Sequence, residues 1–291
     1  MGLRLGEVHY NSSAVRELPD YHGFKFSKSM GQHFLIDRNI PEKIVRLSGL
    51  DESCGVLEVG PGVGALTIEL CKTVGYVTTV ELDKRLLPIL TDTLAGRNNV
   101  TIVQGDILKL DIKKLTNENM PGVRHHVCAN LPYNITTPAL TAFISAGIFE
   151  SITVMVQREV ARRICASPGS SDYCAFSVYM NYYSEPKILF DVPPECFIPQ
   201  PRVFSSVMSI KTRSELLLTL ENEAMFFRIV RASFGLRRKT LINALLAAFG
   251  QSMSKEEIAG IVKKCGIDEK ARGETLSIEK FAELAGHFVR L

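Results

Sequence analysis

Four consecutive residues, Asn130-Leu131-Pro132-Tyr133, carry the most specific chemical signal in the chain. The side-chain carbonyl of Asn130 and the backbone carbonyl of Leu131 can accept hydrogen bonds from both hydrogens of a planar amine, such as adenine N6. That arrangement draws the nitrogen towards sp³ geometry and aims its lone pair at an incoming methyl group. Pro132 stiffens the turn because its ring fixes φ. Tyr133 offers a face on which a flipped-out base can stack.

A glycine-rich segment, Gly60-Pro-Gly62-Val-Gly64, follows a short apolar run at residues 55–59. Glycines let the backbone turn sharply and approach a ligand, and a helix that follows such a turn offers free N–H groups. The spacing GxGxG differs from the dinucleotide fingerprint GxGxxG, and no pyrophosphate cradle is evident. The pattern therefore favours a cofactor that brings no phosphate, S-adenosylmethionine, in contact with Gly60 and Gly62.

Two acidic residues stand at the ends of the next two expected strands. Glu81 can accept hydrogen bonds from both ribose hydroxyls of a nucleoside-like cofactor, as the acidic residue does in nucleotide-binding folds. Asp83 lies close by and suits the capping of the next helix. Asp106 suits the exocyclic amino group of the cofactor's adenine, although an aspartate at this point is equally typical of a turn.

Strand-like and helix-like segments alternate along the first 165 residues, with expected strands at 55–59, 76–81, 99–104, 123–129 and 152–156. This alternation is typical of βαβ units in a mostly parallel sheet, whose ligands bind beyond the carboxyl ends of the strands. We therefore expect the four motifs to meet at one edge. Two further strand-like runs, 175–182 and 203–211, are expected to form an antiparallel hairpin at the sheet edge.

After residue 212 the strand signals stop, and helices are expected at 225–234, 240–249, 255–264 and 277–288. The expected organisation is an N-terminal arm (1–30), a methyltransferase domain (31–212) and a helical RNA-binding domain (213–291). The fold class is α/β: a Rossmann-like class I methyltransferase sheet with a small C-terminal all-helical domain. The net charge of +3 falls in the last segment, which holds 13 Lys and Arg against 10 Asp and Glu. That surplus favours a basic accessory domain.

Composition excludes several classes of protein. No apolar run approaches the roughly 18 residues that cross a bilayer, and the first residues resemble neither a signal peptide nor a transit peptide. The seven cysteines are scattered without a CxxC pair, which favours reduced thiols in the cytoplasm over a disulfide framework or a zinc site. We expect no metal and no membrane contact.

The order of the motifs resembles that of the ribosomal RNA adenine dimethyltransferases, specifically the bacterial kasugamycin-sensitivity type. The resemblance covers residues 28–291. It rests on segments 28–37, 57–67, 80–83, 104–108, 130–133, 156–161, 197–203, 234–241 and 272–276.

The resemblance implies roles for individual residues. It implies that the stretch from Gly31 to Leu35 closes over the cofactor, with contacts from His33, where many members carry Asn, and from Leu35. It implies that Phe197 is the aromatic residue opposite Tyr133. The implied catalytic set is Asn130, Leu131, Tyr133 and Phe197, and the implied cofactor set is His33, Leu35, Gly60, Gly62, Glu81, Asp106 and Asn130.

The resemblance also implies a substrate: two adjacent adenosines in a hairpin loop near the 3′ end of 16S rRNA, in the 30S subunit or its precursor. Both become N6,N6-dimethyladenosine, with S-adenosylhomocysteine as the product, and a role in 30S biogenesis follows. We expect a cytoplasmic monomer. Arg158 and the cluster Arg237-Arg238-Lys239, together with Arg162 and Arg163, are candidates for contacts with the RNA backbone.

Three alternatives stay open. A macrolide-resistance methyltransferase modifies a large-subunit rRNA adenine with the same tetrad, but it lacks the pattern at 234–241. DNA adenine methyltransferases usually carry an Asp/Asn-Pro-Pro-Tyr version. A ribosome-assembly factor would act mainly by binding the subunit, a role that can coexist with methylation.

Overall fold

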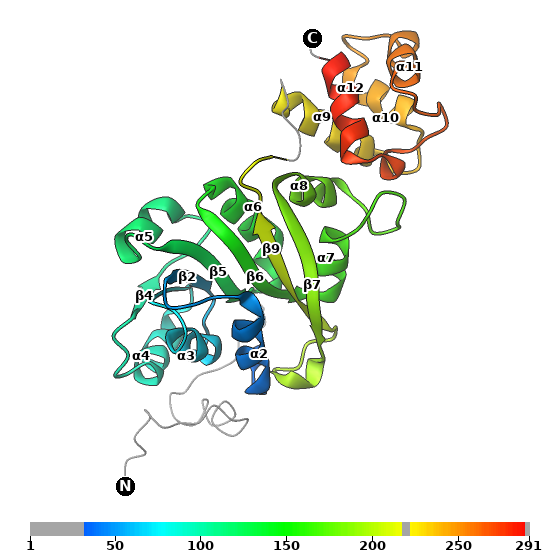
Figure 1. The fold of residues 1–291 in the computed structure, drawn as a ribbon. Coiled ribbons are helices and arrows are strands. Elements are labelled where there is room, and N and C mark those ends of the chain that lie inside the picture. Colours follow the sequence, from blue (N-terminus) through cyan, green and yellow to red (C-terminus); the bar gives the residue numbers. More distant parts are fainter. Residues whose placement is uncertain (1–31, 217–221, 289–291) are drawn as a thin grey trace. The chain divides into compact units, whose positions relative to one another are not determined.

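The computed structural model describes residues 32–216 and 222–288, and its strands form one large and one small sheet (Figure 1). The small sheet pairs β1 (Phe34–Leu35) antiparallel with β8 (Phe197–Ile198). The expected N-terminal arm lies outside the described residues. The large sheet contains β2 (Cys54–Val59), β3 (Tyr76–Glu81), β4 (Val100–Gln104), β5 (Arg124–Asn130), β6 (Phe149–Gln157), β7 (Ser184–Val192) and β9 (Ser205–Thr212).

The large sheet has the spatial order β4-β3-β2-β5-β6-β9-β7. Strand β2 pairs in parallel with β3 on one side and with β5 on the other, and β9 runs antiparallel to β6. The strand order therefore reverses between β2 and β5, which is where ligands bind in open α/β sheets. The expected Rossmann-like sheet is confirmed, including an antiparallel strand close to its edge.

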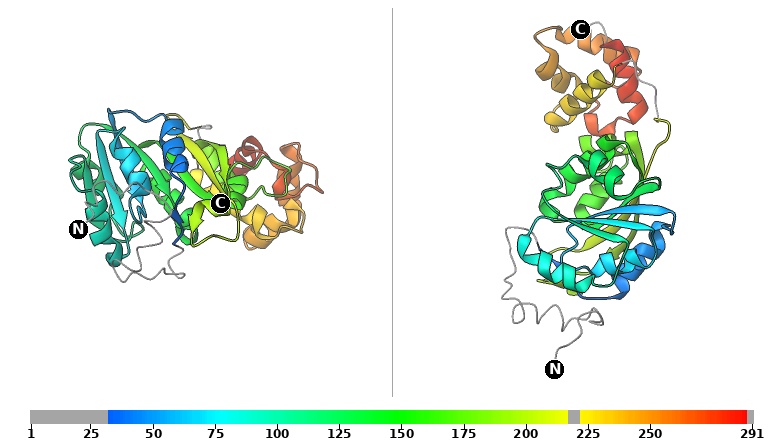
Figure 2. Two further views of the ribbon diagram at one scale, coloured as in Figure 1. Left: turned by 90° about the horizontal axis from the view of Figure 1, so that it is seen from below. Right: turned by 90° about the vertical axis from the view of Figure 1, so that its left-hand side faces the viewer.

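The central strand β2 shows why this sequence forms a covered parallel sheet. All six of its residues are buried, as in a strand that is packed on both faces. Helices flank the sheet (Figure 2), with α2 packed on α3 and α5 packed on α6. The helices that follow the strands are α2 (Asn39–Ser48), α3 (Ala65–Cys71), α4 (Leu87–Thr93), α5 (Ile112–Asn119), α6 (Thr136–Ala146) and α7 (Arg158–Ile164), with short 3₁₀ turns η3 (Lys84–Leu86), η4 (Tyr133–Ile135) and η5 (Pro194–Cys196).

The strand expected at 175–182 is wrong, because this segment forms the helix α8 (Ala175–Tyr183). Its aromatic and β-branched residues suggested a strand, but tertiary packing overrides such propensities. The Cys174 amide donates to Oγ of Ser177 at the start of the helix, and Asn181 donates to the carbonyl oxygens of Ile164 and Ser177. The edge strand is β7, which begins directly after α8.

The chain forms two compact units. Residues 32–161 join residues 187–212 in the sheet unit, and residues 162–186 join residues 213–216 and 222–288 in the helical unit. The division therefore differs from the single boundary expected near 212, because 162–186 packs with the C-terminal helices. The helical unit also contains α9 (Glu223–Gly235), α10 (Leu241–Phe249), α11 (Lys255–Lys264), η6 (Gly273–Thr275) and α12 (Ile278–His287).

The helical unit has a hydrophobic core of its own. Tyr182 of α8 packs against Phe226 of α9, and Phe249 of α10 packs against Phe288 just after α12. These contacts explain why α8 groups with helices that lie far along the chain. Among the helices of the described residues, none is long and apolar enough to cross a lipid bilayer.

Candidate active site

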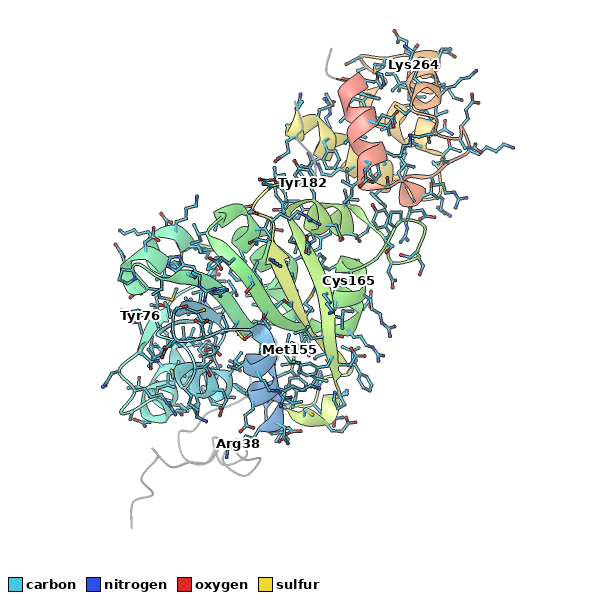
Figure 3. All side chains as sticks on the ribbon, viewed as in Figure 1. Arg38, Tyr76, Met155, Cys165, Tyr182 and Lys264 are labelled. Atoms are coloured by element: carbon cyan, nitrogen blue, oxygen red, sulfur yellow. The ribbon has the colours of Figure 1, made fainter. Side chains whose placement is uncertain are left out.

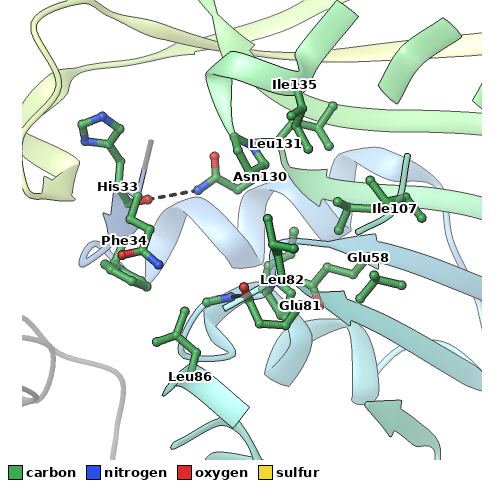
Figure 4. Close-up of a pocket in the computed structure, with 18 of the residues that line it drawn as sticks. His33, Phe34, Glu58, Glu81, Leu82, Leu86, Ile107, Asn130, Leu131 and Ile135 are labelled. Atoms are coloured by element: carbon green, nitrogen blue, oxygen red, sulfur yellow. Dashed lines mark hydrogen bonds between the residues drawn. The ribbon is translucent and has the colours of Figure 1, made fainter. Parts of the chain in front are cut away.

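A cavity of about 350 Å³ opens at the carboxyl ends of β2, β3, β4 and β5 (Figure 4). The segment that contains β1 also contributes to its wall. Each expected strand end therefore supplies part of one cavity, as the topology requires. The expected site residues that line it are His33, Leu35, Gly60, Gly62, Glu81, Asp106, Asn130, Leu131 and Tyr133.

Two glycines of the loop after β2 stand where there is little room for a side chain. Gly62 has a φ of +61°, and a Cβ atom there would lie 2.9 Å from Cε1 of Phe34. Gly60 has a φ of +69°, and a Cβ atom there would meet the ring of Pro132 at 3.3 Å. The loop is therefore held between β1 and the tetrad, with its backbone exposed to the cavity.

Glu81 lies at the end of β3 and is nearly buried. Its Oε2 accepts a hydrogen bond from the Gly62 amide at 3.2 Å, and its Oε1 accepts one from the Asp83 amide at 2.8 Å. Burial raises the pKa of the Glu81 carboxyl. Because a carboxylate oxygen can accept more than one hydrogen bond, the group retains acceptor capacity for a ligand hydroxyl in the cavity.

Asp106 follows β4, where its side chain forms part of a turn and also lines the wall of the cavity. Its Oδ1 accepts from the Leu108 amide at 3.1 Å, and its Oδ2 lies 3.6 Å from Nζ of Lys109. The two interpretations of this residue are therefore compatible, since the same carboxylate shapes the turn and lines the cavity.

Glu58 is a cavity residue that the sequence analysis missed. It is only 1% exposed, and its Oε2 accepts a hydrogen bond from Oγ1 of Thr67 at 2.6 Å. Burial, assisted by the nearby Glu81 carboxylate, raises the pKa of Glu58 to about 8. A carboxyl group inside the otherwise apolar strand at 55–59 was the signal that could have identified it, because unpaired buried charges are costly.

Asn130 ends β5 with its side chain in a defined orientation. Its Nδ2 donates to the backbone carbonyl of His33 at 3.3 Å (Figure 4). With the amide nitrogen committed to this bond, Oδ1 is the acceptor that a substrate amine can use. The amide of Leu131 donates to the Met155 carbonyl at 3.1 Å, which anchors the tetrad to β6.

Tyr133 is held at its ring and at its hydroxyl group. The rings of His33 and Tyr133 are stacked with centroids 5.4 Å apart, and the Tyr133 hydroxyl contacts Oγ of Ser205 at 2.6 Å. Burial raises the pKa of the Tyr133 hydroxyl. The His33 ring is fixed in turn, because Nδ1 donates to the Pro199 carbonyl at 2.6 Å.

Phe197 keeps the role that the resemblance implies, opposite Tyr133, as a prediction. Its side chain is 2% exposed and belongs to a buried cluster with Leu35, Ile44 and Val192, outside the lining of the cavity. Phe197 pairs with Leu35 across the small sheet, and Leu35 lines the cavity. Among the described residues, the ring stacked on Tyr133 is that of His33.

The expected RNA-binding residues belong to two different units. Arg158 is part of the sheet unit, and Arg237, Arg238 and Lys239 form an exposed turn of the helical unit between α9 and α10. Arg237 also has a structural role, since it donates to Glu274 at 3.0 Å and to the Ser171 carbonyl.

Residues 23–284 match the family described as ribosomal RNA adenine dimethylase. The chain belongs to this family. It is 44% identical over 277 residues to a protein of Alkaliphilus oremlandii named ribosomal RNA small subunit methyltransferase A, with 95% of this chain and 96% of the relative covered. Membership makes the protein a methyltransferase, and the cavity at the tetrad is its candidate active site.

Solved structures agree with the fold of this family. A dimethyladenosine transferase from Plasmodium falciparum has a TM-score of 0.76 at 24% identity, covering 89% of this chain and 98% of that one. A 23S rRNA methyltransferase, ErmE, has a TM-score of 0.67 at 25% identity, covering 87% and 98%. The likeness to the Plasmodium falciparum enzyme, at 24% identity, supports the fold alone. In residues 32–216 and 222–288, no group of three or more His, Cys, Asp or Glu side chains is placed to hold a metal ion.

Proposed function

We propose that the protein transfers methyl groups from S-adenosylmethionine to two adjacent adenosines in a hairpin loop near the 3′ end of 16S rRNA. Each adenosine becomes N6,N6-dimethyladenosine. The observation that carries the proposal is the Asn130 amide at the end of β5, held through Nδ2 so that its Oδ1 remains as an acceptor in the cavity. The small-subunit name of relatives at 44% and 47% identity supports this substrate.

The cavity residues fit S-adenosylmethionine, which supplies an electrophilic methyl group on a sulfonium when bound. Glu81 would accept hydrogen bonds from the ribose hydroxyls, and Asp106 would accept one from the adenine amino group. Gly60 and Gly62 would meet the ligand with backbone atoms only. The nearby carboxyl of Glu58 favours a cationic ligand, since its ionised form becomes less costly beside a positive charge.

The tetrad would orient the attacking amine. The Asn130 side chain and the Leu131 backbone would each accept one N6 hydrogen, which directs the nitrogen lone pair towards the methyl donor. A strong general base is unnecessary, because the methylated nitrogen is acidic and releases its proton to solvent. Positioning of the two reactants would account for most of the rate.

Tyr133 would provide the stacking surface for the target base. Its ring is fixed by His33 on one side and by Ser205 at the hydroxyl, so it can meet an extruded base without reorganisation. Loop adenosines suit such a site because they are already unstacked or easily flipped. His33 and Leu35 would close the cavity from the β1 segment.

Contacts with the RNA backbone would come from both units. We assign Arg158 of the sheet unit, and separately Arg238 and Lys239 of the helical unit, to phosphate groups. Arg237 belongs to the same turn as Arg238, but some of its donors are already used by Glu274. The domain 213–291, extended by residues 162–186, would be the RNA-binding domain. The protein would act as a monomer in the cytoplasm, where bacterial 30S subunits assemble, and would contribute to their biogenesis.

A second candidate is methylation of large-subunit rRNA, because the likeness to ErmE covers most of the chain. Relatives with far higher identity carry the small-subunit name, so this candidate ranks second. A third interpretation is an assembly factor that acts mainly by binding. Equal 30S binding by wild type and Asn130→Ala, with the same effect of both on subunit maturation, would favour that interpretation.

Substrate mapping tests the proposal. The protein is incubated with methyl-labelled S-adenosylmethionine and with unmethylated 30S subunits, 50S subunits or double-stranded DNA, and the modified base is located by primer extension and mass spectrometry. We expect label on two adjacent adenosines of the 30S RNA alone. Label on 50S RNA or on DNA, with none on 30S subunits, would overturn the proposal.

A further inference from the structure

An exposed apolar segment lies directly beside the tyrosine of the tetrad. Val203 and Phe204 are 45% and 39% exposed, and they immediately precede β9. The next residue, Ser205, is buried and its Oγ contacts the Tyr133 hydroxyl at 2.6 Å. Since consecutive Cα atoms are about 3.8 Å apart, the Phe204 backbone lies one residue from the group that fixes Tyr133.

Arg158 contacts Phe204 through its backbone and its side chain, and these contacts fix the position of Phe204 in the sheet unit. The Arg158 amide donates to the Phe204 carbonyl at 3.0 Å, and the guanidinium carbon lies 4.4 Å from the centre of the Phe204 ring. Nη1 of Arg158 is 3.9 Å from Oδ2 of Asp191, whose Oδ1 accepts from Oγ of Ser206 at 2.6 Å. Phe204 and Arg158, here called the Phe204–Arg158 platform, are therefore held by a backbone bond, a cation–π contact and an aspartate.

The chemistry of this platform matches single-stranded RNA. An exposed aromatic ring stacks on any base, and an adjacent guanidinium can contact a phosphate group. The long Arg158–Asp191 pair is partly solvent-accessible, with side chains 36% and 43% exposed, so it orients the guanidinium without neutralising it fully. Phe204 is an exposed ring with a cation over it, and it lies beside the tyrosine of the tetrad. It thus combines the two elements that bind unpaired nucleotides, an aromatic surface and a positive charge.

We propose that the Phe204–Arg158 platform binds the nucleotide next to the target adenosine, with its base on Phe204 and its phosphate on Arg158. This inference rests on the proposed function and adds a positioning site outside the cavity. When one adenosine of the pair is at Tyr133, its neighbour occupies the platform. Loss of the platform therefore raises KM for the RNA more than it lowers kcat, and it leaves cofactor binding unchanged.

Steady-state kinetics with unmethylated 30S subunits test this inference. Phe204→Ala removes the ring, Phe204→Tyr retains it, and Arg158→Ala removes the cation without touching the apolar surface. The matched control is Tyr76→Ala, an aromatic residue that is 41% exposed at the start of β3, the end of that strand away from the cavity (Figure 3). Tm and the Kd for S-adenosylmethionine are measured for each variant.

We expect KM for 30S subunits to rise about 5- to 100-fold in Phe204→Ala, from the usual strength of base stacking, and to return to within about 2-fold of wild type in Phe204→Tyr. Arg158→Ala raises KM with a weaker dependence on salt. Tyr76→Ala stays at the wild-type value. The inference is overturned if Phe204→Ala and Arg158→Ala behave like Tyr76→Ala, or if Phe204→Tyr is as impaired as Phe204→Ala.

A direct binding measurement separates this inference from the proposed function. Wild type and variants are titrated with a fluorescent single-stranded oligoribonucleotide that contains two adjacent adenosines. If wild type fails to methylate 30S subunits, the proposed function falls. The platform is then judged by this titration alone: weaker binding by Phe204→Ala and Arg158→Ala supports it, and binding equal to that of Tyr76→Ala overturns it.

Discussion

The backbone carbonyl of His33 accepts a hydrogen bond from Nδ2 of Asn130 at 3.3 Å, across 97 positions of sequence. This bond determines which end of the Asn130 amide faces a substrate amine. The ring of the same histidine lies against Tyr133, and its Nδ1 donates to Pro199. One residue of the β1 segment therefore orients both polar elements of the tetrad.

The first prediction concerns this amide. Asn130→Ala removes the side-chain acceptor for the adenine amino group, and we expect methyl transfer to 30S subunits to fall at least about 10²- to 10³-fold. Calorimetry with S-adenosylmethionine should show binding that is weakened but retained. Near-normal turnover in this variant would contradict the role given to Asn130.

The second prediction separates the ring of Tyr133 from its hydroxyl group. Tyr133→Ala loses base stacking, so we expect a loss of about 5- to 100-fold in kcat/KM for 30S subunits. Tyr133→Phe keeps the ring and loses only the contact with Ser205, so its activity should lie much closer to wild type. Equal activity of Tyr133→Ala and wild type would argue against stacking.

The third prediction concerns the tight contact between Gly62 and Phe34. Gly62→Ala adds left-handed strain of roughly 1–2 kcal/mol and also places Cβ against the Phe34 ring. Gly96→Ala is the matched control, because Gly96 has a φ of +81° but nothing within 4 Å of a built Cβ. We expect both to lower the free energy of unfolding, measured in urea, and only Gly62→Ala to weaken cofactor binding. Unimpaired binding by Gly62→Ala would be inconsistent with the close fit.

The fourth prediction is a pH dependence that comes from Glu58. Because burial raises the pKa of Glu58 from 4.5 to about 8, the folded protein keeps this proton over a range in which the unfolded chain loses it. The contribution of Glu58 to stability is therefore complete below about pH 4.5 and declines as the pH rises to about 8. The neutral amide of the Glu58→Gln variant carries no such penalty, and its oxygen can still accept from Thr67.

Urea denaturation of wild type and Glu58→Gln at several pH values checks this expectation. The free energy of unfolding of Glu58→Gln minus that of wild type should increase between about pH 5 and about pH 8 and then level off. A difference that is independent of pH would show that Glu58 titrates normally in the folded protein.

The fifth prediction distinguishes neighbouring basic residues of the helical unit. Arg237→Ala loses the bonds to Glu274 and Ser171. We expect the free energy of unfolding to fall by only about 1 kcal/mol, because solvent screens this partly exposed ion pair. The side chains of Arg238 and Lys239 have no hydrogen-bond or ion-pair partner among residues 32–216 and 222–288. Alanine at either position should leave Tm unchanged.

RNA binding should depend on Arg238 and Lys239, the two residues whose replacement leaves Tm unchanged. Arg238→Ala and Lys239→Ala should each reduce the slope of log K against log salt by about 0.7 to 0.9, the value for one lost phosphate contact. An unchanged slope in both variants would remove this turn from the RNA-binding surface.

The strand ends of the site were predictable because a buried parallel strand leaves a clear apolar run, and the residue after it must lie at the carboxyl edge. Glu81, Asp106 and Asn130 line the cavity for that reason. Glu58 was missed because a position inside an apolar strand is typical of the core. Its carboxyl group is the local sign of a special position, because an unpaired buried charge is costly.

The wrong expectation at residues 175–182 has a different cause. Residues 175–182 were assigned by residue type, although Phe176, Tyr179 and Tyr183 recur at helical spacing and contact one another as rings. The position of Phe197 depends on the small sheet, where this residue pairs with Leu35. Such long-range pairing leaves no local signal.

The small sheet also has a consequence for synthesis of the chain on the ribosome. His33 reaches its partner Pro199 across 166 positions, and β1 pairs with β8 over a similar span. When a nascent chain has emerged from the ribosome only as far as the tetrad, it therefore still lacks β8, the strand that anchors the β1 segment. It also lacks Ser205, the serine that fixes Tyr133. The β1 wall of the cavity is anchored and Tyr133 is fixed only after Ser205 has emerged, so catalytic competence arises late in translation.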